Sequence, residues 1–243
     1  MTVSGAASPP PVEKSLRRMV SAMDLFESRR AAMAPQASLR FKLLPRKPGV
    51  SVDDVDLNIV GATVVVPVAV APDRSFTLPR HAKALEENAT VMPDRVARSM
   101  TWRAQVRSPG LPEGALRLGD LRLECLVGME AALISEKPSL VGRLVAALTD
   151  SPAYCDSPDN RYIFFADRPL FNVTLSWAGR RQDLPASRLW AGAVGDPRLR
   201  EEMPYCDCEV LLDRAYFLPL ADRSWPDDTL VMFEGMSDGV APR

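Results

Sequence analysis

Histidine is almost absent from this sequence, since His81 is the only one in 243 residues. A zinc site with two imidazole ligands is therefore excluded, and a Ser-His-Asp triad would depend wholly on His81. This residue follows an apolar stretch, in a segment typical of a loop or a helix start. The glycine patterns of nucleotide-binding loops are absent as well. We therefore expect no catalytic residue, no cofactor and no metal site, and the sequence favours a non-enzymatic protein.

Long apolar runs and net charge are also lacking. The longest apolar stretch, 59–71, is interrupted by glycine and proline and is shorter than the roughly 20 residues of a membrane helix. The chain has 30 basic and 31 acidic residues, so its net charge of −1 predicts no attraction to nucleic acid or an anionic membrane. No secretory signal is visible at the N-terminus. Three alternatives remain for the compartment: a cytoplasmic protein, a true start further upstream, or a signal that has been removed.

Periodicity predicts helices at both ends of a β-rich segment. Residues 1–11, which include three consecutive prolines, are expected to form a disordered leader, and the next apolar residues recur at helical spacing within 12–35. From Leu118 the period is helical again, with Asp120 as a candidate cap, and a second helix is expected over 140–148. The strands that we expect lie at 39–44, 55–60, 63–70, 75–78, 101–106, 162–165, 171–177 and 229–233.

One stretch of the β-rich segment resembles a known family. A strand that carries a proline is followed by an Asp-led turn and then by an aromatic residue and a leucine before proline, at Val66, Pro67, Val68, Asp73, Phe76, Leu78 and Pro79. This order resembles the transthyretin-like or carboxypeptidase regulatory-like β-sandwich of many bacterial envelope proteins, over about 38–107. The resemblance implies a mainly β fold and a binding or scaffolding role at the cell envelope. We expect a sandwich core with its following helix over 38–135, and a helix with a β-rich region over 136–243.

The cysteines lie in a near-repeat. Tyr-Cys-Asp occurs at 154–156 and again at 205–207, and each copy is followed by an arginine with two aromatic residues and then by Ala-Asp-Arg. Four thiols allow three complete pairings. In an oxidising compartment Cys155 would pair with Cys206 or Cys208; the alternatives are free buried cysteines and a thiolate metal or redox site. The candidate disulfide or thiol residues are Cys125, Cys155, Cys206 and Cys208.

A candidate ligand face consists of aromatic and basic residues in the last third of the chain. Such side chains could stack on a carbohydrate or another ligand. Their period-two placement, however, favours the interior of a sandwich. The residues are Arg161, Tyr162, Phe164 and Trp177.

The sequence thus supports one functional hypothesis and two alternatives. The first is a non-enzymatic binding or structural protein of the bacterial envelope, periplasmic or secreted, with a protein or envelope ligand as partner. A second is a cytoplasmic thiol- or metal-dependent enzyme that uses Cys206 and Cys208. A third is an assembly adaptor that docks on a partner through the helix at 12–34.

Overall fold

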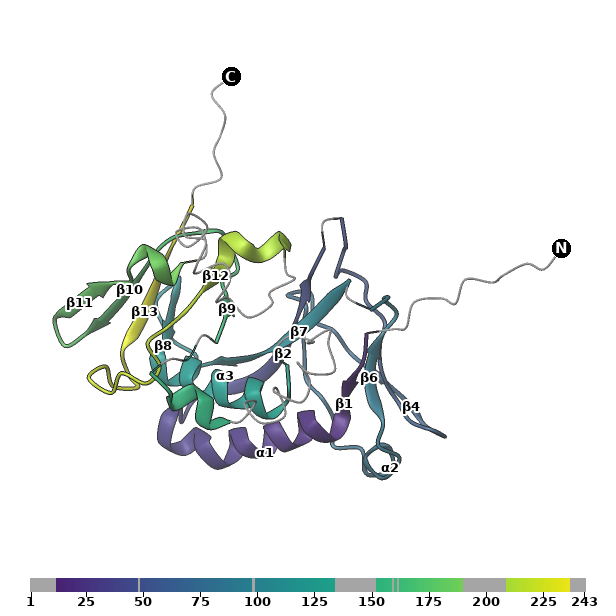
Figure 1. Cartoon of the computed structure of the whole chain (residues 1–243). Coiled ribbons are helices and arrows are strands. Elements are labelled where there is room, and N and C mark those ends of the chain that lie inside the picture. Colours follow the sequence, from purple (N-terminus) through teal and green to yellow (C-terminus); the bar gives the residue numbers. More distant parts are fainter. Residues whose placement is uncertain are drawn as a thin grey trace, which may run out of the picture.

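A buried helix, α3 (Leu118–Glu130), lies between two lobes of the protein (Figure 1). The computed structural model describes residues 12–47, 49–97, 99–133, 152–158, 160, 162–189 and 209–236. This part of the chain is mainly β, as predicted, and its sheets are antiparallel. The predicted leader at 1–11 and the predicted helix at 140–148 lie outside the described residues. Each lobe has its own hydrophobic core, and α3 contributes side chains to both.

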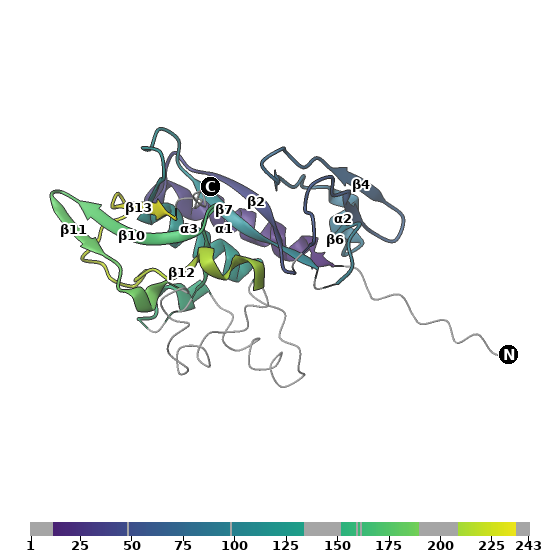
Figure 2. The same ribbon diagram turned by 90° about the horizontal axis from the view of Figure 1, so that it is seen from above.

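The N-terminal lobe contains two sheets that share one core. One sheet has the strand order β1-β6-β3-β4 and the other has the order β5-β2-β7. Its strands are β1 (Lys14–Ser15), β2 (Ser38–Pro45), β3 (Leu57–Val60), β4 (Val65–Val68), β5 (Ser75–Phe76), β6 (Thr90–Pro93) and β7 (Met100–Arg107). Seen from above, the long strands β2 and β7 lie between the β1-β6-β3-β4 sheet and the C-terminal lobe (Figure 2).

The pairing of β2 with β7 separates an apolar face from a basic one. Leu43 lies opposite Trp102 and both are buried in the N-terminal core, because successive side chains of a strand point to opposite faces. On the other face, Lys42 lies opposite Arg103. The predicted strands at 39–44 and 101–106 are confirmed, and their register places a row of cations toward the C-terminal lobe.

The predicted N-terminal helix is confirmed as α1 (Leu16–Met33). The Ser15 hydroxyl accepts a hydrogen bond from the backbone N–H of Arg18, which caps the first turn. The apolar side of α1, including Leu16, Met19 and Phe26, is buried in the N-terminal core, and α1 packs against α3. A partner that docks on α1 would therefore have to contact its polar side, because the apolar side is already covered by the protein itself.

Helix α3 is buried around almost its whole circumference, including three of its charged side chains. Leu123 and Val127 pack in the N-terminal core, while Leu121 and Cys125 pack in the C-terminal core. The expectation that Asp120 caps this helix is wrong. The cap position is occupied by Arg117, which makes no side-chain cap bond, and the first backbone N–H groups donate instead to the carbonyls of 227 and 229.

The C-terminal lobe is built on a sheet of strand order β11-β10-β13-β8, beside a two-stranded pair, β12-β9. A short helix, α2 (Ala82–Glu86), belongs to the N-terminal lobe, whereas the 3₁₀ turns η1, η2 and η3 lie in this one. Its elements are β8 (Ala115–Arg117), η1 (Pro152–Asp156), β9 (Phe164–Phe165), β10 (Leu170–Trp177), β11 (Arg180–Asp183), η2 (Ala186–Arg188), η3 (Glu209–Arg214), β12 (Ala215–Tyr216) and β13 (Leu230–Gly235).

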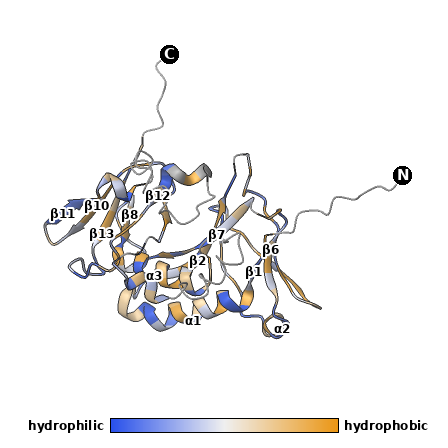
Figure 3. Ribbon diagram, viewed as in Figure 1, coloured by the Kyte–Doolittle hydropathy of each residue, from blue (hydrophilic) through white to orange (hydrophobic). Residues whose placement is uncertain are grey.

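The two copies of the near-repeat meet in the C-terminal lobe. Phe164 pairs with Tyr216 and Phe165 with Ala215, so that the strand of one copy is hydrogen-bonded to the strand of the other. The rings of Phe164 and Tyr216 stack with their centroids 5.4 Å apart. The edge strand β11 is exposed and hydrophilic, in contrast to the apolar strand β6 (Figure 3). Charged side chains on an exposed edge oppose pairing with other chains.

A glycine in α3 sets the distance between this helix and the aromatic core. A Cβ atom added to Gly128 would lie 2.1 Å from the hydroxyl oxygen of Tyr162. We expect Gly128→Ala to lower the free energy of unfolding by about 1–3 kcal/mol, through overpacking. Combined with Tyr162→Phe, it should cost less than the sum of the two separate changes, because the closest atom is removed. Urea unfolding of the four proteins measures this coupling.

The matched control for this cycle is Gly235→Ala. At Gly235 the nearest atom to an added Cβ is 3.6 Å away, so the change should have little effect. Equal costs for Gly128→Ala and Gly235→Ala, or strict additivity with Tyr162→Phe, would contradict the close approach.

Candidate functional site

Three charged side chains of α3 are buried and hold the lobes together. Glu124 accepts hydrogen bonds from the backbone N–H of Val106, at 3.0 Å, and from the guanidinium of Arg107. Asp120, one helical turn earlier, accepts from the backbone N–H and the hydroxyl of Ser108, both at 2.8 Å. These two carboxylates therefore attach α3 to the end of β7, and burial raises the pKa of both groups.

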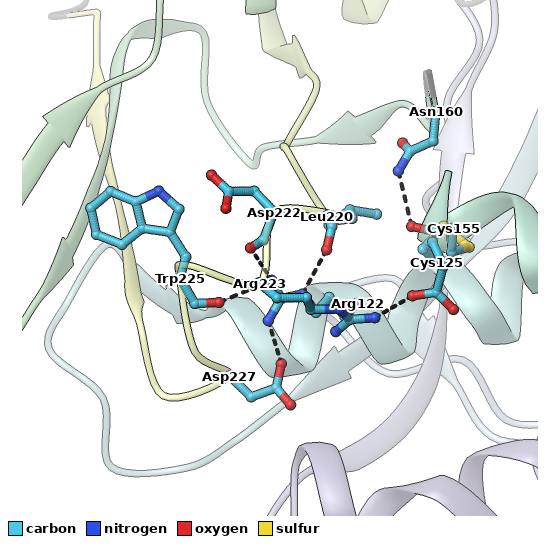
Figure 4. Close-up of polar contacts among 10 residues, drawn as sticks. Arg122, Cys125, Cys155, Asn160, Leu220, Asp222, Arg223, Trp225 and Asp227 are labelled. Carbon is cyan, nitrogen blue, oxygen red and sulfur yellow. Dashed lines mark hydrogen bonds and ion pairs between the residues drawn. A yellow bond between two sulfur atoms is a disulfide. The ribbon is translucent and has the colours of Figure 1, made fainter. Parts of the chain in front are cut away.

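Arg122 attaches the same helix to the loop at 220–227 (Figure 4). Its guanidinium donates to the carbonyl oxygens of Leu220, Asp222 and Trp225, at 2.8, 2.8 and 3.0 Å, and to the carboxylate of Asp227 at 2.6 Å. A buried cation is tolerated only when its donors are satisfied. These hydrogen bonds thus offset the cost of burying the Arg122 side chain. They also satisfy backbone carbonyl groups of a loop without regular structure.

A disulfide between Cys125 and Cys155 joins α3 to η1 (Figure 4), with an S–S distance of 2.00 Å and 6.0 Å between the Cα atoms. Both residues are buried, with exposed fractions of 0% and 3%. The sequence-based pairing of Cys155 with Cys206 or Cys208 is therefore corrected. Sequence distance says nothing about which thiols meet, whereas the packing of η1 on α3 brings these two together. Cys206 and Cys208 lie outside the described residues.

Two of the four residues of the candidate ligand face are buried. Tyr162 and Phe164 are buried in the C-terminal core, where their ring centroids are 4.9 Å apart, and burial raises the pKa of Tyr162. Trp177, at the end of β10, is 40% exposed. Arg161 lies outside the described residues. The pairing of β9 with β12 turns the first two rings inward, which agrees with the alternative that they belong to the core.

The single histidine has a structural contact. The Nδ1 atom of His81 accepts a hydrogen bond from the backbone N–H of Ala84, at 3.2 Å, and so caps α2 as the predicted helix start. Within the described ranges there is no group of three or more His, Cys, Asp or Glu side chains that could hold a metal ion. A search of the same residues found no helix with the length and hydropathy needed to cross a bilayer.

A pocket of about 510 Å³ opens between the lobes, and we call it the interlobe cleft. One wall comes from β2 and the residues that follow it, together with the turn at 72–74; the other comes from the C-terminal lobe. The residues that line it are Lys42, Leu43, Leu44, Pro45, Lys47, Gly49, Val50, Pro72, Asp73, Arg74, Ala166, Asp167, Leu211 and Arg214. No protein-family model, curated protein or solved structure matches the chain.

Cations outnumber carboxylates around the interlobe cleft. Lys42 forms an ion pair across the cleft with Asp167, whose side chain is 77% exposed. Arg214 donates to the backbone carbonyl of Asp167 at 2.8 Å. Lys47 is exposed and has no ion-pair partner in the described part of the chain. Among the residues that line the cleft four are basic and two are acidic. Two of these cations also have a carboxylate beside them, Arg74 next to Asp53 and Arg214 next to Asp213 at 3.9 Å.

The cleft was not predicted from the sequence. The signal was present in part, because β2 and β7 both alternate apolar residues with polar or basic ones. Two such strands could present a basic face only if they paired in the observed register, with Lys42 opposite Arg103. That register depends on contacts between residues some 60 positions apart, for which no local pattern exists.

The buried carboxyl group of Asp120 leads to a prediction on the pH dependence of the free energy of unfolding. Because burial raises its pKa in the folded protein, folding favours the protonated carboxyl. The free energy of unfolding should therefore fall as the pH rises from about 4, the unfolded pKa of an aspartate, to the folded pKa. Asp120→Asn should reduce this slope. Urea unfolding at a series of pH values above about 4 measures it.

The carboxyl groups with a lowered pKa, such as those of Asp73 and Asp222, affect the stability of the protein in a different pH range. Their hydrogen bonds from Ser75 and Ser224 add stability that is lost only as the pH falls below about 4. The exposed Asp228→Asn variant serves as control and should keep the slope of the unmodified protein. If Asp120→Asn also keeps that slope, the role assigned to the buried carboxyl is wrong.

Proposed function

We propose that this chain is a non-enzymatic binding protein of an oxidising, extracytoplasmic compartment, and that the interlobe cleft is its ligand site. The observation that carries the proposal is the buried disulfide between Cys125 and Cys155, at the junction of the lobes. Structural disulfides persist in secreted and periplasmic proteins and are rare in the reducing cytosol. A covalent bond at this position holds the wall formed by the C-terminal lobe relative to α3.

We further propose that the N-terminal lobe is a transthyretin-like sandwich. Two antiparallel sheets over one core support this, as does the turn that carries the family resemblance. In that turn the carboxylate of Asp73 accepts from the backbone N–H and the hydroxyl of Ser75, at 3.0 and 2.5 Å, directly before Phe76 in β5. An Asx turn of this kind explains why an aspartate opens the motif. Binding and scaffolding roles are common on this architecture.

The test is the state of the four cysteines in protein purified from its native host. Thiols are trapped with acid and alkylated before and after reduction, and the intact mass counts the labels. We expect at most two labels without reduction and four after it, because Cys125 and Cys155 are paired. Peptide mapping should place both of these residues in one disulfide-linked fragment.

Four labels before reduction would overturn the proposal, since the pair would then be reduced in the native compartment. The Cys125→Ala, Cys155→Ala variant, expressed in the same host, is the matched control for the label count. Its unreduced label number should equal that of the unmodified protein, because the disulfide contributes none.

A further inference from the structure

The geometry of the interlobe cleft points to a small anionic ligand, one that presents a carboxylate or phosphate group to Lys42, Lys47 and Arg214. This inference rests on the proposed function, because it names the ligand class of the same site. At about 510 Å³ the cleft is in the size range of small-molecule sites. Its two walls come from different lobes, so a ligand placed there contacts residues that the sequence separates by more than 160 positions.

More basic than acidic side chains line the cleft. Lys42 and Arg214 both contact Asp167, Arg214 through the backbone carbonyl and Lys42 through the carboxylate. That carboxylate is the only one that bridges to Lys42 in the described residues, and it is largely exposed to solvent. The Lys42 side chain, in contrast, is only 22% exposed. Because the carboxylate of Asp167 stands in solvent and can move away, a ligand anion can compete with it for Lys42.

A half-buried cation, Arg103, lies on the strand next to Lys42. Arg103 lies opposite Lys42 on the same face of β2 and β7, with its guanidinium carbon 5.7 Å from the ring centroid of Phe165. Its Nε and Nη1 atoms are buried and have no hydrogen-bond partner among the residues that the structure describes. No carboxylate there pairs with this guanidinium. Because charges act more strongly where water is excluded, Arg103 adds to the positive potential without touching the ligand.

The cations of the cleft are of two types, arginine and lysine. An arginine guanidinium presents donors in a planar fork that matches carboxylate and phosphate oxygens, and a lysine adds a mobile point charge. Arg214 is held at the cleft by its bond to the carbonyl of Asp167. Lys47 is exposed and has no ion pair within the part of the chain that the structure describes, so its ammonium group can move toward a ligand. Together they predict recognition of oxyanions over chloride.

The test is binding of inorganic phosphate, pyrophosphate and citrate to the full chain by calorimetry, at constant ionic strength set with chloride. We expect saturable binding that weakens as sodium chloride is added, because salt screens the charges. A preference for pyrophosphate over citrate would identify a phosphate ligand, and the reverse a carboxylate ligand. Absence of binding for all three probes at about 10 mM would overturn the inference.

Four variants test whether the cations of the cleft, and not other cations of the protein, bind the anion. Lys42→Gln and Arg214→Gln should each weaken binding about tenfold or more, the effect of one charge-assisted hydrogen bond. The side chain of Lys47 is exposed and has no ion pair in the described residues, so Lys47→Gln serves as the test if the first two variants unfold. Arg181→Gln, an exposed residue at the far edge of the C-terminal sheet, removes the same charge and should leave the affinity unchanged. Equal losses for all four would show nonspecific binding and refute the site.

Asp167→Asn provides a test in the opposite direction. The variant keeps the backbone carbonyl that Arg214 uses but removes the carboxylate that competes for Lys42. Anion affinity should rise severalfold, a result that misfolding would not produce. Unchanged or weaker binding would overturn the competition that the structure implies.

The anion-binding experiment and the cysteine-labelling experiment test separate claims, and either one can fail without the other. Loss of anion binding with the disulfide intact in the native host would refute the ligand class and leave an extracytoplasmic binding role standing. Reduced cysteines in the native host would refute the compartment, and they would leave the calorimetric result on the cleft unaffected.

Discussion

Replacement of Arg122 by methionine should lower the free energy of unfolding by about 3–5 kcal/mol, the usual cost of removing one partner from a buried charge network. The side chain makes four hydrogen bonds to the loop at 220–227. Methionine fills a similar volume but leaves three backbone carbonyls without a donor. Each unsatisfied buried acceptor costs about 1–3 kcal/mol before the loop relaxes. Equilibrium unfolding in urea measures the change.

Two further variants give the Arg122 prediction its controls. Arg122→Lys keeps the charge but offers a compact head with fewer and shorter-reaching donors, so its cost should be intermediate. Arg223→Met removes a cation of the same loop that pairs with Asp156 at the surface, and should cost less than about 1 kcal/mol. A loss for Arg122→Met as small as that for Arg223→Met would show that the loop is held by other contacts.

Removal of the disulfide should have the second largest effect. The 30-residue separation between Cys125 and Cys155 corresponds to about 3–4 kcal/mol in the chain-entropy model of cross-linking. Alanine replaces both residues in the variant, because a buried serine hydroxyl would add a desolvation cost of its own. Thermal and urea unfolding should show a lower midpoint for Cys125→Ala, Cys155→Ala.

The unmodified protein in a strong reductant is the matched control for the disulfide. Its stability should fall to nearly that of the double-alanine variant, and the reductant should leave the variant itself unchanged. If reduction leaves the unmodified protein as stable as before, the bond contributes nothing to the fold, and the link between the lobes must be sought in the charges of α3.

These two effects are large for the same physical reason. Arg122 and Cys125 lie less than one turn apart on α3, and each attaches this helix to a segment that has little regular structure of its own. The loop at 220–227 and η1 have only a few backbone hydrogen bonds of their own, and these do not attach them to the rest of the lobe. Helix α3 supplies both anchors because it is buried on nearly every side.

Most of the local structure was predictable from the sequence. The helical spacing within 12–35 and from Leu118 predicted α1 and α3, alternation predicted β2 and β7, and apolar strand signals predicted β10 and β13. One-sided burial imposes a period of 3.6 on a helix such as α1 and of 2 on a strand. The position of His81 at a helix start was also confirmed. In each case the signal lies within a few neighbouring residues, where sequence and structure are directly coupled.

The wrong predictions concern the interaction partners of side chains rather than the positions of helices and strands. Asp120 was expected to cap α3, but its carboxylate accepts from Ser108, and the helix start is bonded to the carbonyls of a loop about 110 positions away. The expected partners of Cys155 lie some 50 positions downstream, whereas the real one precedes it in the chain. A carboxylate or a thiol has the same local sequence signal whichever partner it meets.

The sequence by itself determined where α1, α3 and the long strands β2, β7 and β10 form, because the spacing of apolar residues follows the period of each element. The short strands β6, β8, β11 and β12 were not predicted. The sequence also determined that the chain has one histidine, four thiols and almost no net charge. Only the tertiary structure decided that Cys125 meets Cys155, that Arg122 holds the loop at 220–227, and that basic residues of both lobes gather at one cleft. These outcomes depend on strand register and on the docking of two lobes onto α3, which are set by contacts between distant residues.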